Sequence, residues 1–277
     1  MQATRPIGIF DSGVGGLSIA RAIKQRLPNE AICYVGDTAH MPYGACTTAQ
    51  LQAYAKDIGQ LLQAQPCKLI LIACNTAAAA ATAMLRDYVG PSTPVVNVVD
   101  PLVEHMCHQW RGQVVGLIGT DYTIRSGVYP QKLAGCRAAI QLQTVATPLL
   151  APMIEQDNLQ IEVLEAYLAH PHLQDMAALA LGCTHYVLIQ PHITRFYKGR
   201  VCIIDNAAVT TLFLQDFLAS RNLLNLDKPI YPDQFLATDL TPHFQKITYR
   251  YFGQEAGAVV PQTDVPALEH TTPTVVS

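Results

Sequence analysis

The chain has 277 residues, of which 50% are hydrophobic and 14% charged, and this length can build one large domain or two ordinary ones. Its formal net charge of −3 is not typical of a surface that binds nucleic acid or anionic membranes. The apolar stretch without charge at residues 69–85 is shorter than the roughly 20 apolar residues of a membrane helix. The opening residues "MQATRPIGIFDSG" lack the apolar run of a secretory signal. We therefore expect a cytoplasmic protein without a nucleic-acid or membrane partner.

Short apolar runs without alternation recur along the chain and predict strands buried on both faces of a parallel sheet. These runs are residues 7–10, 32–35, 69–73, 95–99, 114–118, 142–145, 178–181 and 201–204. Amphipathic stretches between them predict helices, among them residues 18–26, 48–63, 77–88 and 207–219. This alternation of strands and helices is typical of an α/β fold with open, mainly parallel sheets.

The chain has two similar halves, because "IACNT" closes a strand in the first and "ALGCTH" closes one in the second. We place the boundaries near Val98 and Ala207. Residues 1–97 with 208–255 would form the first α/β domain, and residues 98–207 the second. The last residues, 256–277, are rich in Pro, Thr and Val without periodicity, which is typical of a mobile tail.

Several predicted strands end in a polar residue or a cysteine, and in open parallel sheets ligands bind at the carboxyl ends of the strands. These residues are Asp11, Asp37, Cys74, Asp100, Thr120, Cys183 and Asp205. They are candidates to surround one cleft. The alternative is that they cap the helices that follow, and for Asp205 we prefer this interpretation.

A glycine-rich segment, "FDSGVGGLSIARAI", follows the first predicted strand. It does not match G-x-G-x-x-G, and Asp11 would repel a pyrophosphate, so a dinucleotide site is a poor interpretation. We expect a tight turn whose amides point, with Ser12, into the mouth of the cleft. Asp11 would receive an ammonium group, orient a base or cap the helix. A second turn, "MPYG" at residues 41–44, offers amides for a carboxylate.

Eight cysteines occur, and the closest two, Cys67 and Cys74, are seven residues apart (74 − 67). No zinc spacing is present, and the length argues against a disulfide scaffold. We expect most of these thiols to be buried and inert. Cys74 and Cys183 differ because each stands where a strand meets a helix, and the helix dipole lowers the pKa of a thiol there.

Hydrogen-bonding residues follow both thiols: Asn75 and Thr76 after the first, Thr184 and His185 after the second. They can bind a carboxylate, and His185 can tune the proton affinity of its neighbour. One cysteine beside a histidine would suggest a thiol hydrolase. Two equivalent cysteines suit a reaction between mirror images, in which one thiolate removes a proton and the other thiol protonates the opposite face.

Several motifs resemble those of the cofactor-independent glutamate racemases, within the wider group of aspartate and glutamate racemases. The motifs are "GIFDSGVGGLSI", "VGDTAHMPYG", "LIACNTA", "LIGTDYTIRSGVY", "TPLLAPMIE" and "ALGCTHYVLI". They cover residues 5 to 220 in one order. The resemblance implies two domains facing each other across an active-site cleft, no pyridoxal phosphate, no metal, a homodimer, and a role in supplying D-glutamate for peptidoglycan.

The same resemblance assigns site residues. Cys74 and Cys183 would be the two acid–base groups, the first serving D-glutamate and the second L-glutamate. Asp11 would assist Cys74, and His185 would assist Cys183. The substrate would be held by Asp11, Ser12, Tyr43, Gly44, Asn75, Thr76, Thr184 and His185. Further candidates on these motifs are Asp37, Pro42, Thr120 and Glu155, and the two acidic ones would shape the charge of the site.

Three alternatives stay open from the residues. The segment "EHMCHQW" at 104–110 contains metal-ligand types, but a polar helix face fits its spacing better than a zinc site. An amino-acid-binding module would also use a polar cleft between two domains, although it has no need of paired thiols. Within the enzymes, an aspartate racemase or a related amino-acid racemase is the second candidate.

Overall fold

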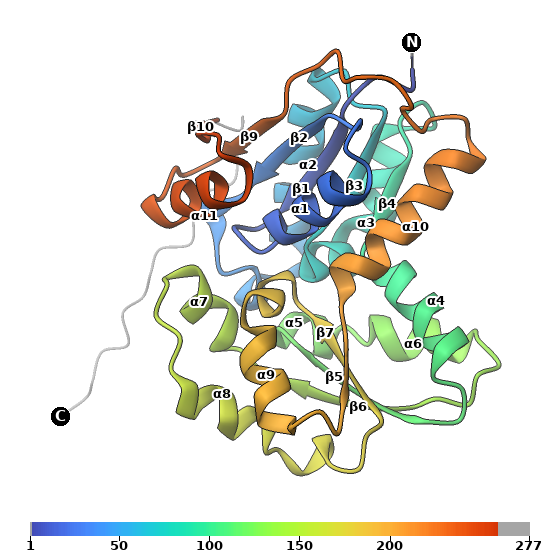
Figure 1. Cartoon of the computed structure of the whole chain (residues 1–277), viewed down its shortest axis with the longest axis vertical. Helices are drawn as coiled ribbons and strands as arrows, with labels where there is room; N and C mark the ends of the chain where they lie inside the picture. The colour runs from blue at the N-terminus through green and yellow to red at the C-terminus, as the bar shows by residue number, and fades with distance from the viewer. Residues whose placement is uncertain (1, 260–277) are drawn as a thin grey trace.

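The computed structural model describes residues 2–259 and folds them around two sheets, one above the other in Figure 1. Both sheets are parallel throughout. The first has the order β10-β9-β2-β1-β3-β4 and the second the order β6-β5-β7-β8. The predicted α/β class with two parallel sheets is therefore confirmed.

All eight predicted strands are present, each within two residues of its predicted ends. They are β1 (Ile7–Asp11), β2 (Ile32–Gly36), β3 (Leu69–Ile72), β4 (Val95–Asn97), β5 (Val114–Gly119), β6 (Gln141–Ala146), β7 (Ala178–Gly182) and β8 (Cys202–Ile204). Two further strands complete the first sheet: β9 (Gln234–Ala237) and β10 (Gly257–Ala258). Because β10 pairs with β9, the predicted mobile tail cannot begin at residue 256. Residues 260–277 of that prediction lie outside the described part of the chain.

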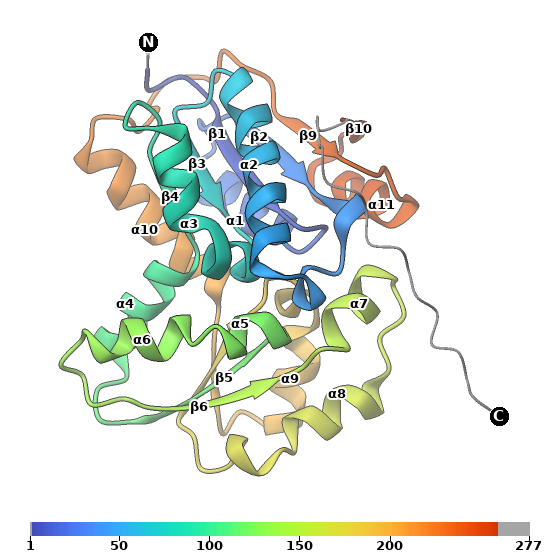
Figure 2. The ribbon, with the colours of Figure 1, turned by 180° about the vertical axis from the view of Figure 1, so that it is seen from behind.

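Helices cover both faces of each sheet (Figures 1 and 2). The α-helices are α1 (Leu17–Arg26), α2 (Thr48–Ala64), α3 (Asn75–Val89), α4 (Val99–Gln109), α5 (Asp121–Arg125), α6 (Val128–Ala134), α7 (Leu150–Glu155), α8 (Ile161–Leu168), α9 (Gln190–Tyr197), α10 (Asn206–Ser220) and α11 (Pro242–Phe252). The 3₁₀-helices are η1 (Thr38–His40), η2 (Tyr43–Ala45), η3 (Pro171–Leu173) and η4 (Thr184–Ile189). Among the described residues, no helix combines the length and apolar character needed to cross a bilayer.

The central strands β1, β2, β3, β5 and β7 are almost entirely apolar because the sheets bury both of their faces. Along β1, Ile7 and Ile9 pack against the side covered by α1, α10 and α11, whereas Phe10 packs against α2 and α3. In the second sheet, Val115 and Leu117 face α4 and α6, and Ile118 faces α7, α8 and α9. Alternate side chains of a strand point to opposite faces, so a run without polar residues marks a central strand.

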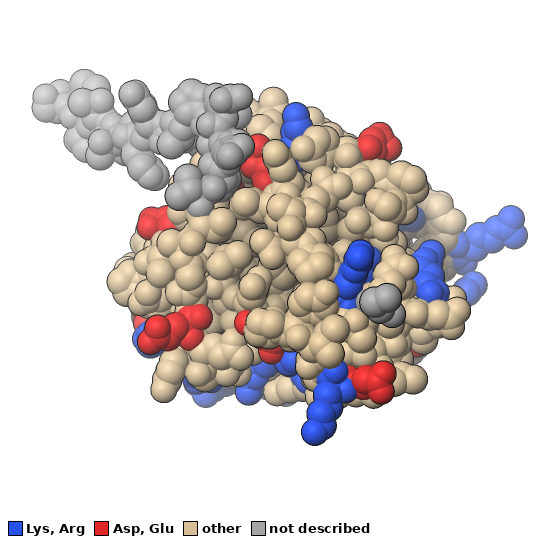
Figure 3. Space-filling view, turned by 90° about the horizontal axis from the view of Figure 1, so that it is seen from above, with Lys and Arg blue, Asp and Glu red and all other residues tan. Residues whose placement is uncertain are grey.

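The chain crosses between the sheets twice, from β4 into α4 and from β8 into α10. We propose these connections, near Val98 and Ala207, as the domain limits. On the face shown in Figure 3, basic and acidic side chains occur together, separated by wide uncharged areas. That face is therefore neither uniformly basic nor uniformly acidic.

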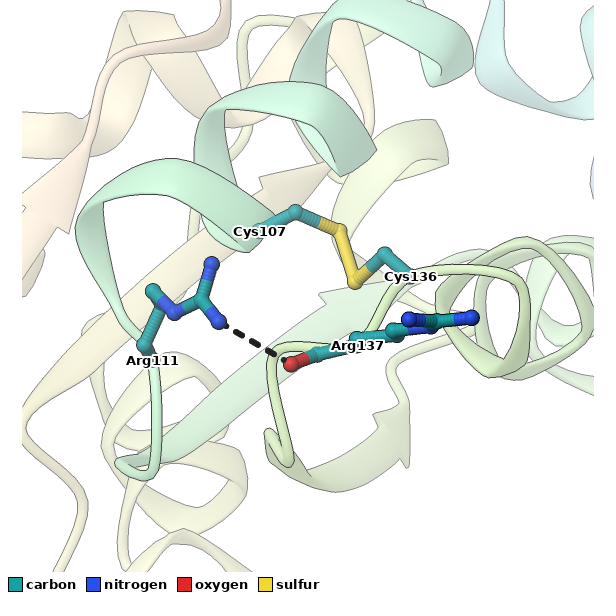
Figure 4. The surroundings of a disulfide bond; sticks show 4 residues. All are labelled: Cys107, Arg111, Cys136 and Arg137. Atoms are coloured by element: carbon teal, nitrogen blue, oxygen red, sulfur yellow. Dashed lines mark hydrogen bonds between the residues drawn. A yellow bond between two sulfur atoms is a disulfide. The ribbon is translucent and has the colours of Figure 1, made fainter.

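Most of the cysteines are buried free thiols, as expected, but two of them form a disulfide that the sequence did not predict. Cys107, on α4, and Cys136, which follows α6, form a disulfide with their Cα atoms 6.3 Å apart (Figure 4). Beside it, Arg111 donates to the backbone carbonyl of Arg137 at 3.2 Å. The remaining six cysteines are free thiols, and all but Cys202 are buried. The two bonded residues are 29 apart in sequence, and only the packing of α4 on α6 brings them together.

Candidate active site

A cavity of about 370 Å³ lies where the carboxyl ends of the two sheets meet. Eleven of the predicted site residues line it: Ser12, Pro42, Tyr43, Gly44, Cys74, Asn75, Thr76, Thr120, Cys183, Thr184 and His185. The other three, Asp11, Asp37 and Glu155, lie behind this lining and bond to it. Further lining residues lie within the same sequence motifs but were not predicted as site residues, among them Met41, Pro148 and Pro152. Both thiols, Cys74 and Cys183, therefore line the same cavity.

Cys74 is the N-cap residue of α3, two residues after the end of β3, and is 5% exposed. Its Sγ donates to the Oγ of Ser12 at 3.6 Å. Burial, and then the charge of Asp11, raise the pKa of Cys74 to about 12, although the Ala77 amide and Ser12 act in the other direction. The predicted lowering of this pKa by the helix dipole is wrong, because desolvation of the thiolate outweighs it. Cys74 is thus a protonated thiol at neutral pH.

Cys183 follows β7 and precedes η4, a 3₁₀-helix that leads into α9. The Nδ1 of His185 lies 3.6 Å from its Sγ, and the Nε2 of His185 lies 2.6 Å from the Oε2 of Glu155. Burial lowers the pKa of His185, but the hydrogen bonds with Cys183 and Glu155 outweigh it and raise this pKa well above its ordinary value. His185 thus links Cys183 to the carboxyl of Glu155. The two thiols therefore differ in their surroundings.

Asp11 ends β1 and is fully buried. Its Oδ1 accepts from the amide of Gly13 and its Oδ2 from the hydroxyl of Thr184, both at 3.0 Å. Burial raises the pKa of Asp11 to about 6, against the lowering effect of His185. The carboxyl thus joins the first half of the chain to the second and titrates close to neutral pH.

The glycine-rich turn does not offer its amides to the cavity as predicted. The amide of Gly13 bonds to Asp11, and the amide of Val14 donates to the Oε2 of Glu155 at 3.1 Å. A Cβ on Gly15 would lie 2.7 Å from the backbone nitrogen of His185. The glycines therefore let this turn approach η4 closely, which brings the two halves together.

Three threonines and one asparagine supply hydroxyl and amide groups around the thiols. The Oγ1 atoms of Thr76 and Thr120 lie 2.8 Å apart, and the hydroxyl of Thr120 donates to that of Thr123 at 2.9 Å. The Oδ1 of Asn75 accepts from the hydroxyl of Tyr129 at 2.5 Å. The Nδ2 of Asn75 is buried and has no protein partner. Preorganised donors of this kind stabilise a developing negative charge.

The other aspartates predicted at strand ends do not line the cavity. Asp37 is buried behind Tyr43 and accepts from its hydroxyl at 2.5 Å, so it holds a lining residue. Asp205 accepts from the amides of Ala207 and Ala208 and caps α10, as predicted. The prediction that Asp100 lies at the cleft is wrong. Because β4 ends at Asn97, Asp100 falls in the first turn of α4, where its Oδ1 lies 2.7 Å from the Nζ of Lys132.

Within residues 2–259, no three His, Cys, Asp or Glu side chains are grouped as metal ligands. The cavity lining also contains no lysine that could form a Schiff base with a substrate or cofactor. Its ionisable groups are the two thiols, His185, Tyr43 and Asp121. Acid–base chemistry by paired thiols is the chemistry that this set of residues can perform.

An α/β fold of two parallel sheets, with two thiols on one cavity, defines the class of racemases that use two cysteines. Residues 16–212 match the family model Asp/Glu/hydantoin racemase, and the chain belongs to this family. It is 35% identical over 254 residues to the glutamate racemase of Neisseria meningitidis serogroup A, covering 90% of this chain and 93% of the relative. It is 36% identical over 258 residues to that of Corynebacterium diphtheriae, covering 87% and 96%.

A solved structure agrees with these relatives. The glutamate racemase of Francisella tularensis in complex with D-glutamate superposes with a TM-score of 0.83 at 32% identity. The match covers 95% of this chain and 99% of that one. The family resemblance in the sequence is thereby confirmed over nearly the whole chain.

Proposed function

We infer that the chain is a glutamate racemase, which interconverts L-glutamate and D-glutamate without a cofactor. The observation that carries this inference is the placement of Cys74 and Cys183 on one cavity between the two sheets. The relatives named glutamate racemase at 35% and 36% identity support the choice of substrate. The family description also includes aspartate, so aspartate is the second substrate to test.

We propose that the resting enzyme holds a thiolate at Cys183 and a thiol at Cys74. The imidazolium of His185 favours the first state, and burial of Cys74 favours the second. L-glutamate binds with its α-hydrogen toward Cys183, whose sulfur takes this proton and leaves the electron pair on the α-carbon. Cys74 then gives its proton to the opposite face. The products are D-glutamate, a thiol at Cys183 and a thiolate at Cys74.

The reverse reaction begins from the opposite protonation state, with Cys74 as the base. Because the pKa of Cys74 is about 12, this sulfur needs a nearby acceptor to lose its proton. We propose that Asp11 accepts this proton transiently and passes it to solvent, since its charge acts on Cys74 and its pKa of about 6 leaves it ionised at neutral pH. The transfer to Asp11 is uphill because a carboxylate with this pKa is a weaker base than the Cys74 thiolate, and release of the proton to solvent completes the step.

The carbanion formed between the two steps needs stabilisation, because an α-proton is far less acidic than a thiol. Delocalisation into the substrate's own carboxylate places the developing charge on oxygen. We propose that the Nδ2 of Asn75 and, once it turns away from Thr120, the hydroxyl of Thr76 donate to these oxygens, while Thr184 keeps its bond to Asp11. Both donors belong to side chains that line the cavity.

Racemisation is tested by incubating the purified protein with each enantiomer of glutamate and of aspartate and following optical rotation or chiral chromatography. We expect both enantiomers of glutamate to reach a racemic mixture, with aspartate at least tenfold slower. A protein that binds glutamate but incorporates no solvent deuterium at its α-carbon would be a binding module, and the inference would be wrong. Faster turnover of aspartate would reassign the substrate within the family.

We also propose that the enzyme is a cytoplasmic homodimer that supplies D-glutamate for peptidoglycan. This proposal rests on the family resemblance. In the reducing cytoplasm, Cys107 and Cys136 would be held as thiols. Light scattering of the purified protein tests the dimer, and growth of a D-glutamate auxotroph expressing the chain tests the cellular role.

A further inference from the structure

A tyrosine outside the cavity lining contacts the site across the two halves of the chain. Tyr129 stands in the first turn of α6, and its side chain is 1% exposed. Its hydroxyl donates to the Oδ1 of Asn75, which is 54 residues away in sequence, at 2.5 Å. Asn75 is the first residue of α3, next to Cys74, and lines the cavity. Tyr129 therefore reaches the site only through Asn75.

This bond fixes the orientation of the Asn75 amide. An amide group presents an acceptor at Oδ1 and two donors at Nδ2. With Oδ1 bonded to Tyr129, the buried Nδ2 is left without a protein partner. A buried donor without a partner is costly, and an acceptor on a ligand in the cavity would satisfy it.

The opposite orientation of the amide is less favourable. If the amide were reversed, Nδ2 would donate to the phenol, and the phenol proton would then need an acceptor of its own. Within residues 2–259, the hydroxyl of Tyr129 makes no hydrogen bond except that with Asn75. Burial also raises the pKa of Tyr129, so the hydroxyl keeps the proton that it donates.

Helix α6 is itself held in place on α4. The disulfide between Cys107 and Cys136 joins the two helical segments (Figure 4), and the Nζ of Lys132 lies 2.7 Å from Asp100 on α4. When the two cysteines are reduced, the ion pair and the buried cluster that Leu133 of α6 shares with Leu102 and Met106 of α4 still hold this helix in place. A fixed donor of this kind can select one orientation of the Asn75 amide.

We propose that Tyr129 is a positioning residue, which holds the Asn75 amide with its nitrogen toward the carboxylate of the bound substrate. The proposal rests on the racemase function inferred above. It assigns no proton-transfer step to Tyr129. Its effect is to prevent the Asn75 oxygen from facing, and repelling, the substrate's carboxylate.

The test is Tyr129→Phe, which removes the hydroxyl and keeps the ring. We expect kcat/KM for glutamate to fall about tenfold, through a higher KM and a lower kcat together, because Asn75 binds the substrate's carboxylate and stabilises the charge that develops on it. The matched control is Tyr197→Phe. The hydroxyl of Tyr197 donates to the backbone of Leu168 at 2.9 Å, away from the cavity. This control loses a comparable hydrogen bond, and its kinetics should stay within twofold of the wild type.

A double-mutant cycle with Asn75→Ala separates positioning from a general structural effect. If Tyr129 acts through Asn75, Tyr129→Phe should change kcat/KM less than twofold when Asn75 is already alanine. Equal losses in both backgrounds, or wild-type kinetics in the single variant, would overturn the proposal. These outcomes require an active wild type, so they differ from a failure of the proposed function, in which the wild type itself racemises no glutamate.

Discussion

The substitution Glu155→Gln tests the role of charge behind Cys183. The Oε2 of Glu155 lies 2.6 Å from the Nε2 of His185, and the two side chains are 12% and 2% exposed. Glutamine can still accept from His185 through its amide oxygen, so the substitution removes the charge and can keep the hydrogen bond. The measured change therefore reports on the imidazolium and on the thiolate beside it.

The magnitude follows from the difference between two kinds of hydrogen bond. A bond to a charged group contributes about 1.5–3 kcal/mol, and a neutral one about 1 kcal/mol. The substitution therefore lowers the stability of the imidazolium by about 1.5 kcal/mol, which is about a tenfold loss in proton affinity. The pKa of His185 falls, less of the enzyme holds a thiolate at Cys183, and kcat/KM falls about tenfold at neutral pH.

The loss must be equal in the two directions. Because enantiomers have the same free energy, the equilibrium constant is one, and kcat/KM from L-glutamate equals kcat/KM from D-glutamate in any variant. Racemisation assays from both enantiomers check this equality, and an NMR titration of His185 measures its pKa. The control is Glu165→Gln, at an exposed position of α8, which should leave both quantities unchanged. An unaltered His185 pKa together with kcat/KM within twofold of the wild type would refute the reasoning.

Three further predictions concern the thiols, Asp11 and the buried ion pair. Cys74→Ser or Cys183→Ser should each reduce racemisation at least a thousandfold and leave a folded protein by circular dichroism, whereas near-native activity in either variant would exclude the two-thiol mechanism. Because burial raises the pKa of Asp11 to about 6, its carboxylate form is lost as the pH falls. The kcat/KM of the wild type should therefore decline below about pH 6, and the residual activity of Asp11→Asn should lack this inflection. Lys68 is buried with Glu30 and donates to the Leu223 carbonyl at 2.8 Å, so Lys68→Met should lower the free energy of unfolding by about 3–5 kcal/mol; a urea denaturation that shows less than 1 kcal/mol would contradict this.

The central strands could be predicted because a continuous apolar run of four to eight residues has few alternatives between two helices. β9 was missed because its Gln234 is exposed and Leu236 only half-buried. Its four residues therefore show no clear pattern. β10 has two residues, which is too short for any pattern. Asp100 was misplaced for a different reason. Residues 98 and 99 are apolar and were predicted to continue the strand, but they form the start of α4.

The site could be predicted where its residues lie next to each other in sequence. Cys74 with Asn75, and Cys183 with His185, were recognised from adjacent letters. Interactions between distant segments could not be derived in this way. The bond from Tyr129 to Asn75 and the disulfide from Cys107 to Cys136 depend on how α6 packs. The high pKa of Cys74 depends on burial and on Asp11, neither of which a local motif shows.

The most direct test of two thiols acting on opposite faces is the early course of the wild-type reaction in deuterium oxide. With L-glutamate as substrate, mass spectrometry and proton NMR of the separated enantiomers follow the label at the α-carbon. Two separate acid–base groups predict that the D-glutamate formed carries deuterium while the remaining L-glutamate carries hydrogen. Deuterium in the remaining L-glutamate at early times, or hydrogen retained in the D-glutamate, would contradict the account.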